Sequence, residues 1–203
     1  MALTTVLLFG DRRLPRPLAG SPSVQITDPA AIDEAIGGAG RVAVVGDDAD
    51  LAAVLSRLMR TERLDVEVAH VRNRWPCGWL SARRAASRPA RRVPLIRDDT
   101  GTALVGAAVW LPPEGSPALT GEAVVDDVVL FDGESAGVRI EPTLTMPGLR
   151  ATVLGGRRRW ISGRAAQLGT TGVRVVRDGV PGRRETKRST FYRHTTGWLR
   201  VDC

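Results

Sequence analysis

The chain has 203 residues, of which 43% are hydrophobic, 25% are charged and only 4% are aromatic, and its formal net charge is +7. These proportions are typical of a soluble globular protein with one domain or two small ones, and the apolar run over residues 2–9 is too short to span a membrane. We therefore expect a cytoplasmic protein without a transmembrane segment, in which Cys77 and Cys203 are reduced and unpaired.

Arginine carries almost all of the positive charge, because Lys187 is the only lysine. The arginines are densest over residues 72–92, 157–159 and 183–188. Guanidinium groups form bidentate contacts with phosphates, so one interpretation is a phosphate-rich partner and the other is an arginine-biased composition. With so few aromatic residues, nucleic acid is expected to bind only weakly, without sequence preference and in a salt-dependent way.

The first part of the chain alternates strand and helix patterns. Buried strands are expected over residues 4–9, 41–45 and 64–71, and helices over residues 29–37 and 48–62. Asp28 is suited to cap the first helix and Pro29 to occupy its first position, while residues 10–23 are expected to be a loop rich in proline and glycine. This order predicts a small three-layer α/β domain with a parallel sheet over residues 1–74.

The pattern changes after this domain. Residues 75–92 are expected to form an arginine-rich connector with one or two helical turns around residues 80–86. Residues 93–203 are expected to form a β-rich domain, an antiparallel β-sandwich or a similar barrel. Its predicted strands are 93–96, 103–110, 124–131, 137–140, 149–154, 165–168, 173–176 and 198–201. Turns are predicted at Asp99-Thr-Gly101, Asp132-Gly133 and Asp178-Gly179, since Asp-Gly tolerates positive φ.

The most informative stretch is residues 41–50, an apolar strand that breaks at Gly46 and passes directly into a helix. Many α/β proteins hold a phosphate at such a point, because the helix N-terminus presents unpaired backbone N–H groups. Here the same place carries Asp47, Asp48 and Asp50. Carboxylates stabilise a helix start but repel a bare phosphate, so the site either needs a divalent metal or has lost its ligand.

A second candidate site is the basic segment of residues 183–194. We expect it to be ordered and to bind a phosphate-bearing small molecule or a lipid head group through its cations, which are Arg183, Arg184, Lys187, Arg188 and Arg193. The alternative is an edge strand that positive charge keeps soluble. Zinc and serine-hydrolase chemistry are excluded, because His70 and His194 lack ligand spacing and no Gly-x-Ser-x-Gly motif is present.

The order of elements, with Gly46-Asp47 and Asp178-Gly179-Val180, resembles the lipid kinases of the diacylglycerol kinase and sphingosine kinase type, which share their fold with NAD kinase. That family has Gly-Gly-Asp-Gly-Thr where this chain matches only Gly46 and Asp47, and Asp-Gly-Glu where this chain has Val180. The glycine-rich loop after the third strand is replaced by residues 71–76, and the chain is shorter than is usual for the family. The resemblance implies Asp47 as a catalytic residue that acts with Mg²⁺ and ATP.

Glu134, in a second Asp-Gly-Glu triplet, would supply the carboxylate missing at Val180. Glu122, Asp126 and Asp127 would join it around Mg²⁺, since a strand would place Glu122 and Asp126 on one face. The alternatives are a hairpin turn with a solvated Glu134 and a solvated strand face.

From these residues we predict a shortened, lipid-kinase-like protein that is a non-catalytic or regulatory binder of a phosphate-bearing ligand. An active ATP- and Mg²⁺-dependent diacylglycerol-type kinase is one alternative, and a basic module that binds nucleic acid or an anionic surface is another. The oligomeric state is left open, with a homodimer among the alternatives.

Overall fold

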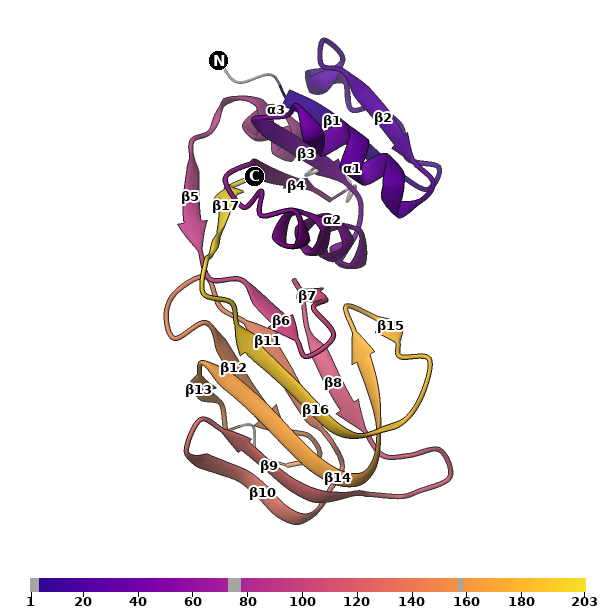
Figure 1. The fold of residues 1–203 in the computed structure, drawn as a ribbon, viewed down its shortest axis with the longest axis vertical. Coiled ribbons are helices and arrows are strands. Elements are labelled where there is room, and N and C mark those ends of the chain that lie inside the picture. The colour runs from indigo at the N-terminus through magenta and orange to yellow at the C-terminus, as the bar shows by residue number, and fades with distance from the viewer. Residues whose placement is uncertain (1–3, 73–77, 157–158) are drawn as a thin grey trace. The chain divides into compact units, whose positions relative to one another are not determined.

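The computed structural model describes residues 4–72, 78–156 and 159–203, so Cys77 and most of the predicted loop at residues 71–76 lie outside it. The chain forms two compact units (Figure 1). Unit 1 contains residues 1–93 and 196–203, and unit 2 contains residues 94–195. Both chain termini therefore belong to unit 1, whereas residues 196–203 had been expected in the β-rich half.

Unit 1 is a six-stranded sheet in the order β2-β1-β3-β4-β17-β5. The strands are β1 (Thr4–Phe9), β2 (Ser23–Ile26), β3 (Arg41–Val45), β4 (Glu67–Val71), β5 (Ala90–Val93) and β17 (Trp198–Val201). Neighbouring strands are parallel except for β17 and β5. The helices are η1 (Arg16–Leu18), α1 (Pro29–Gly37), α2 (Asp48–Arg60) and α3 (Gly78–Ser87). The predicted α/β class of this half is confirmed.

The sheet of unit 1 is buried on both faces, which explains why its strands read as continuous apolar runs. On one face Val6, Leu8 and Val45 pack with Leu18 of η1 and Ala82 of α3 in a single hydrophobic cluster. Helices α1 and α2 belong to the opposite layer (Figure 1). The three-layer arrangement expected from the sequence is therefore present.

Helix α1 begins as the sequence predicts. The Asp28 carboxylate accepts hydrogen bonds from the backbone N–H groups of Ala30 and Ala31 at 2.8 and 3.0 Å, and Pro29 occupies the first helical position. The loop predicted over residues 10–23 contains η1 and the start of β2, which the sequence did not indicate. The helical turns expected around residues 80–86 are present as α3, but α3 and the unexpected β5 both pack into unit 1 and do not form a separate connector.

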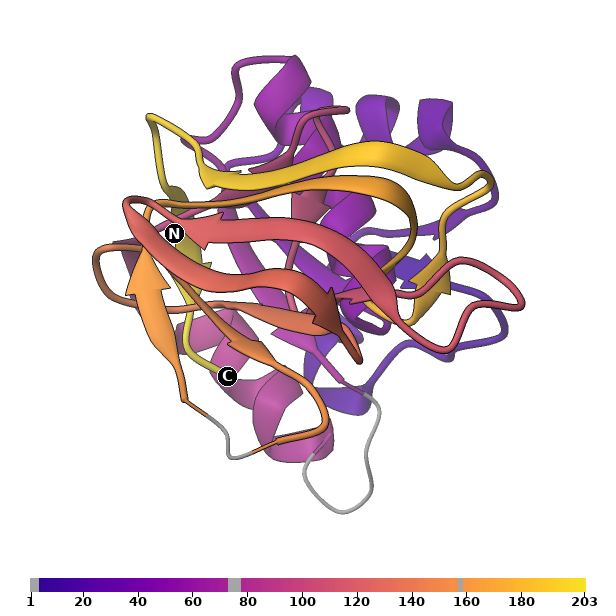
Figure 2. The ribbon, with the colours of Figure 1, turned by 90° about the horizontal axis from the view of Figure 1, so that it is seen from below.

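The regular elements of unit 2, within residues 94–156 and 159–195, are all strands. Its strands are β6 (Ile96–Asp98), β7 (Ala103–Leu104), β8 (Ala108–Leu111), β9 (Leu119–Val125), β10 (Val128–Ser135), β11 (Val138–Pro142), β12 (Leu149–Val153), β13 (Ile161–Gly163), β14 (Ala165–Arg177), β15 (Val180–Pro181) and β16 (Thr186–Arg193). All of their pairings are antiparallel, and β16, β14, β9 and β10 lie side by side in that order (Figure 2). The antiparallel β class expected for this half is confirmed.

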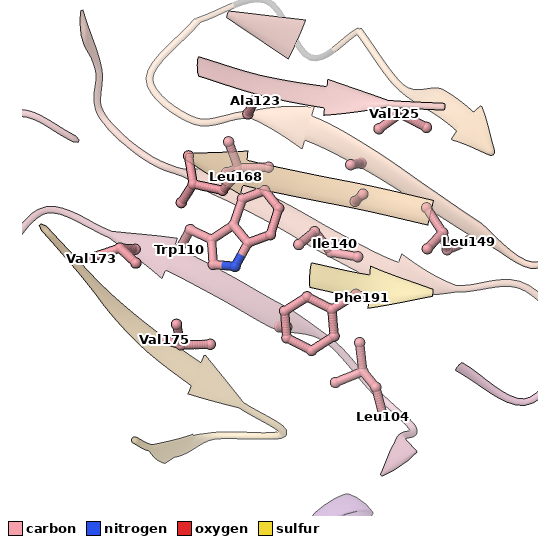
Figure 3. Close-up of a cluster of buried hydrophobic side chains, with 14 of the residues drawn as sticks. Leu104, Trp110, Ala123, Val125, Ile140, Leu149, Leu168, Val173, Val175 and Phe191 are labelled. Atoms are coloured by element: carbon pink, nitrogen blue, oxygen red, sulfur yellow. The ribbon is translucent and has the colours of Figure 1, made fainter. Parts of the chain in front are cut away.

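Strand β14 connects two parts of the sheet in unit 2. Residues 166–170 pair with β9 and residues 174–177 pair with β8, so one long strand replaces the two short strands predicted here. The strand borders a core built around Trp110 and Phe191, whose ring centroids are 6.1 Å apart (Figure 3). The Trp110 indole N–H donates to Ser189 Oγ at 2.9 Å, which satisfies both buried polar groups.

The three strands predicted over residues 93–131 are each wrong as single strands. Residues 93–96 span the end of β5 and the start of β6, and residues 103–110 contain two strands, β7 and β8. Residues 124–131 were expected to be a single strand, but β9 and β10 form a hairpin that turns at Asp126-Asp127. Asp126 adopts a φ of 49°, a conformation that Asp tolerates better than most residues. The Asp132-Gly133 turn is also wrong, because those residues pair with β9 inside β10. The Asp178-Gly179 turn is confirmed, with φ values of 48° and 84°.

Candidate functional site

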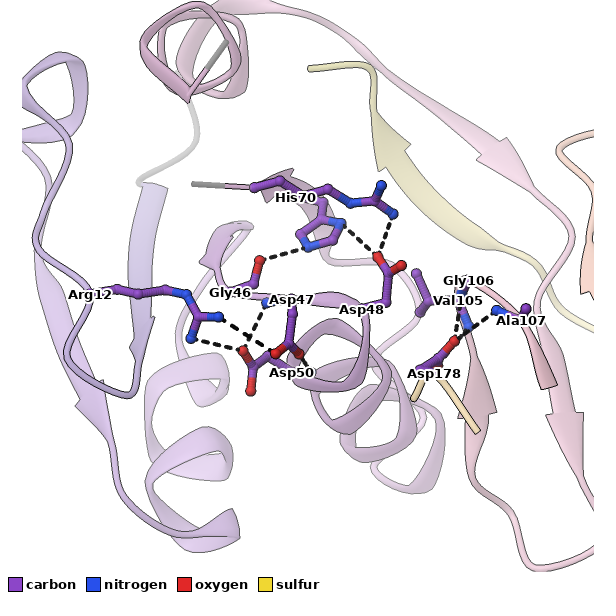
Figure 4. Close-up of polar contacts among 11 residues, drawn as sticks. Arg12, Gly46, Asp47, Asp48, Asp50, His70, Val105, Gly106, Ala107 and Asp178 are labelled. Atoms are coloured by element: carbon purple, nitrogen blue, oxygen red, sulfur yellow. Dashed lines mark hydrogen bonds and ion pairs between the residues drawn. The ribbon is translucent and has the colours of Figure 1, made fainter. Parts of the chain in front are cut away.

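The switch point of the unit 1 sheet is the natural place for a ligand. The chain passes from β1 to β2 on one side and then returns through α1 to β3 on the other side of β1. In open α/β sheets, ligands bind outside the carboxyl ends of the strands at such a reversal. Strands β1, β3 and β4 end at Phe9, Val45 and Val71, and the residues that follow them carry the polar groups of this edge (Figure 4).

The start of α2 is closed by two of its own carboxylates. Asp47 Oδ1 accepts the backbone N–H of Asp50 at 3.1 Å, and Asp50 Oδ2 accepts the backbone N–H of Asp47 at 2.8 Å, which forms a capping box. Gly46 is required beside it, because a Cβ at this position would lie 2.6 Å from Asp50 Cβ. Two of the backbone donors at this helix start, the N–H groups of Asp47 and Asp50, therefore already bind carboxylate oxygens.

Arg12, from the loop after β1, crosses the switch point to both of these aspartates. Its guanidinium lies 3.5 Å from Asp47 Oδ2 and 3.2 Å from Asp50 Oδ2. Burial and the neighbouring Asp47 carboxylate raise the pKa of Asp50. The pKa of Asp47 is lowered: burial alone would raise it, but the Asp50 N–H and Arg12 favour its charged form. Arg12 was not expected at this site, although its position shortly after a predicted strand was a usable signal.

The third aspartate, Asp48, contacts residues at the carboxyl end of β4. It forms an ion pair with Arg72, and its Oδ1 lies 3.8 Å from His70 Nδ1. The other ring nitrogen, His70 Nε2, is 3.1 Å from Gly46 O, and because a carbonyl only accepts, this nitrogen carries the proton. Burial, reinforced by the Arg72 charge, lowers the pKa of His70. His70 is thus a neutral imidazole that fastens the Gly46 turn, a role the sequence did not suggest.

These residues do not fit a bound Mg²⁺. Magnesium requires carboxylate oxygens that are free to coordinate it, and Asp47, Asp48 and Asp50 each face an arginine instead. Within residues 4–72, 78–156 and 159–203, no group of three or more His, Cys, Asp or Glu side chains is placed to hold a metal ion. Glu122, Asp126 and Asp127, which had been expected to share a Mg²⁺ ion, therefore do not form a metal site.

The physical reason for that correction is the turn at Asp126. Asp126 leaves the strand instead of continuing it, and its carboxylate accepts the backbone N–H groups of Arg164 and Ala165, each at 3.0 Å. Glu122 is exposed and lies opposite Asp132 in the β9–β10 ladder. Asp126 therefore stabilises the turn, and Glu122 is on a solvated strand face, which was the alternative interpretation.

Asp178, in the triplet that resembles a catalytic motif, also binds backbone. Its carboxylate accepts three N–H groups, from Val105 at 3.1 Å, Gly106 at 2.6 Å and Ala107 at 3.1 Å (Figure 4). This arrangement joins the β14–β15 turn to the segment before β8. These hydrogen bonds explain an aspartate at this position by a structural role, and no catalytic role is needed to explain it.

Glu134 lies in β10 at a pocket of about 510 Å³ in unit 2. Side chains of Leu130, Phe131 and Ile161 also line this pocket, and Arg159 is its cationic residue. Asp47 belongs to unit 1 and Glu134 to unit 2, so their pairing as catalytic residues stays a prediction.

The basic segment is ordered, because residues 186–193 form β16. Its cations, however, lie in different environments. Arg183 and Arg184 are exposed before the strand, and Lys187 and Arg188 are exposed at its start. Arg193 Nη1 instead donates to Pro147 O at 2.8 Å. A second pocket of unit 2, of about 480 Å³, contains Arg193 together with Arg164, Tyr192, His194 and the two turn aspartates Asp126 and Asp127.

Two observations concern the chain as a whole. None of the helices in the described ranges combines the length and the apolar character needed to cross a bilayer. Cys203 is a free thiol, and burial raises its pKa.

Solved structures share this fold along the whole chain. A structure from Bacillus anthracis str. Sterne assigned as a diacylglycerol kinase aligns with a TM-score of 0.78 and 10% identity, and the match covers 100% of this chain and 98% of that one. Another diacylglycerol kinase structure from the same bacterium gives 0.74 at 10% identity, over 100% and 97% of the two chains.

The chain has the diacylglycerol kinase and NAD kinase fold. An NAD kinase from Archaeoglobus fulgidus in complex with ATP gives a TM-score of 0.65 at 9% identity and covers 98% of this chain and 93% of its own. No family model and no curated protein matches the sequence. The kinase-like fold therefore rests on structure, as the resemblance in element order had predicted.

Proposed function

We propose that this kinase-like protein binds a phosphate-bearing ligand and does not transfer phosphoryl groups from ATP. The observation that carries the proposal is the closed start of α2, where the backbone N–H groups of Asp47 and Asp50 already donate to carboxylates. ATP phosphates would compete there with carboxylates of the protein itself. Arg12 and Arg72, the cations nearest to the site, are engaged by the same aspartates.

The cost of opening this arrangement is the physical basis of the proposal. A phosphate would have to displace the capping box, worth about 1 kcal/mol, and would then meet the negative charges of Asp47 and Asp50 at close range. A metal ion would offset that repulsion only if the aspartates left their arginines. The site therefore favours its own internal ion pairs over a nucleotide.

We assign the phosphate of the ligand to the pocket of unit 2 that contains Arg164 and Arg193. The Arg164 guanidinium is exposed, and no ion pair within the described residues occupies it. His194 adds a ring whose pKa burial and Arg97 lower, so an anion beside it would favour protonation. Tyr192 and Thr195 supply hydroxyl groups to the same pocket. A free phosphate ester and a phosphorylated lipid head group share this chemistry.

Calorimetry tests the proposal with two probes, Mg²⁺ with ATP and glycerol 3-phosphate without metal. We expect no heat of binding from ATP and measurable binding of glycerol 3-phosphate. Arg164→Gln should weaken that binding about tenfold, the loss of one charged hydrogen bond. Arg174→Gln is the matched control, because Arg174 is also an exposed arginine of unit 2 but lies outside the pocket.

The second candidate function is an active ATP-dependent lipid kinase, which the full-length likeness to diacylglycerol kinase structures favours. Low-micromolar binding of ATP with Mg²⁺ would promote it and would refute the non-catalytic proposal. In that event, phosphorylation of diacylglycerol by labelled ATP should be measurable, and Asp47→Asn or Glu134→Gln should abolish it. Loss of turnover in only one of the two variants would separate the role of unit 1 from that of unit 2.

A further inference from the structure

Helix α3 (Gly78–Ser87) presents an unusual surface. Its small residues Ala82 and Ala85 are fully buried against unit 1, so the helix is held by one narrow face. Its opposite side exposes Trp79 and Leu80, which retain 53% and 47% of their accessible surface. Large apolar side chains adjacent on one exposed helix are unfavourable in water and indicate a contact surface.

Positive charge surrounds these two apolar side chains. Arg83 and Arg84 lie one helical turn beyond Trp79 and Leu80, and both are exposed. The Arg83 guanidinium carbon stands 5.7 Å from the centroid of the Trp79 ring. No residue of the helix is acidic, and neither arginine forms an ion pair with any described residue. Arg88 follows the helix, near Asp202, which binds Arg91 and Arg200.

We propose that α3 is a docking surface for an anionic lipid bilayer, with Trp79 and Leu80 entering the interface and Arg83 and Arg84 contacting lipid phosphates. Helices that lie in a membrane surface combine Trp or Leu with arginines in this way. The helix is short, but it is already folded and fixed to unit 1 through Ala82 and Ala85, so docking does not have to order it. The apolar pair distinguishes a bilayer from a nucleic acid, whose phosphates would require the arginines alone.

The surface lies in unit 1 and the proposed phosphate pocket lies in unit 2, so the two proposals are independent. Docking would bring the protein to lipid head groups whether or not the pocket binds them. A failure of one proposal therefore leaves the other standing.

The test is sedimentation of the full chain with vesicles, either of phosphatidylcholine alone or of phosphatidylcholine and phosphatidylglycerol in equal amounts. We expect binding to the anionic vesicles only. Arg84→Gln should reduce the affinity about fivefold, and Arg83→Gln with Arg84→Gln roughly thirtyfold, since each arginine near an anionic surface contributes a similar increment. Trp79→Ser with Leu80→Ser should abolish binding while the variant still unfolds cooperatively, because about half of each side chain is exposed and neither belongs to the core.

Arg60→Gln is the matched control. Arg60 and Arg84 both lie in the last turn of a helix and are both exposed, but Arg60 is on α2. An affinity equal in Arg60→Gln and Arg84→Gln would overturn the proposal, because net charge and not α3 would then explain it. Binding to pure phosphatidylcholine would also overturn it. Tighter binding to duplex DNA than to the vesicles, with affinity for DNA lost in the same arginine variants, would overturn the proposal as well.

Discussion

The aspartates of the two units are held in different ways. In unit 1, Asp47, Asp48 and Asp50 meet arginine side chains at a solvent-accessible sheet edge. In unit 2, Asp126 and Asp178 bind backbone N–H groups inside turns. Side-chain ion pairs at a surface contribute little, about 0–1 kcal/mol, whereas a hydrogen bond to a charged group contributes about 1.5–3 kcal/mol. The acids of unit 2 thus contribute more to the stability of their turns, whereas the ion pairs of unit 1 contribute little beyond the capping box that Asp47 and Asp50 form.

The largest expected effect comes from deleting residues 197–203, which removes β17 from the interior of the unit 1 sheet. Trp198 and Val201 are buried there, and β17 pairs with both β4 and β5. Burial of the two side chains alone contributes roughly 1.5–3 kcal/mol each, and the backbone ladder adds to this. We expect hydrogen exchange to show unit 1 opened and the strands of unit 2 still protected. An unchanged thermal midpoint would show that the terminus does not stabilise the sheet.

The next largest effect is expected in unit 2, from Asp98→Ala. Asp98 is fully buried, and its Oδ1 accepts the N–H groups of Thr100 and Thr102, each at 2.9 Å, while its Oδ2 lies 2.5 Å from Arg177 Nε. Arg177 keeps only 22% of its side-chain surface exposed, so the variant leaves a largely covered guanidinium without its counter-charge and two N–H groups without their acceptor, at a cost of about 3 kcal/mol. Urea unfolding measures the loss. Asp99→Ala, the exposed neighbour, is the control, and an equal loss in both variants would contradict the role assigned to Asp98.

The comparison also explains how far the sequence could be used to predict the fold. The strands and helices of unit 1 follow from local patterns, such as the Asp28 cap and the apolar run of β3. In unit 2, Asp132-Gly133 and Asp178-Gly179 carry the same turn signal, but only the second forms a turn. What separates them is which strand each segment pairs with, and that depends on residues far along the chain. The return of β17 to the first sheet is non-local in the same sense.

The candidate site shows the same limit. The Gly46–Asp50 turn was found because its glycine, cap and helix are adjacent in the sequence. Arg12, His70 and Arg72 were missed, because they reach this turn from the ends of β1 and β4. Each lies at or shortly after the carboxyl end of a strand that the sequence did predict. A search of all predicted strand ends, not one motif, would have brought them together.

A smaller effect is expected in unit 1, from Asp47→Ala. This change removes the N-cap of α2 and one of the two Arg12 contacts. Loss of a helix N-cap costs about 1 kcal/mol, which is less than the loss expected for Asp98. Thermal unfolding of Asp47→Ala and Asp98→Ala, measured side by side, tests the comparison directly. A cost at Asp47 equal to that at Asp98 would mean that the acids of unit 1 are as deeply built into the fold as those of unit 2.

The smallest effect is the pH dependence that His70 contributes to unit 1. Its pKa in the folded protein lies below the unfolded value of about 6.5, because burial and Arg72 disfavour the charged ring. Above the unfolded pKa this contribution to stability is complete. As the pH falls below it, the unfolded chain takes up the proton first, so stability decreases until the folded pKa is reached.

His70→Gln removes this contribution and should flatten the dependence of the thermal midpoint on pH below about 6.5. The difference between wild type and variant is the quantity to follow, since Asp50, whose pKa is raised, acts in the opposite direction in both proteins. His194→Gln serves as the comparison in unit 2, where the pKa of His194 is also lowered but the ring lies at a pocket. We expect a smaller change there. A pH profile unaltered by His70→Gln would show that the imidazole does not fasten the Gly46 turn in its neutral form.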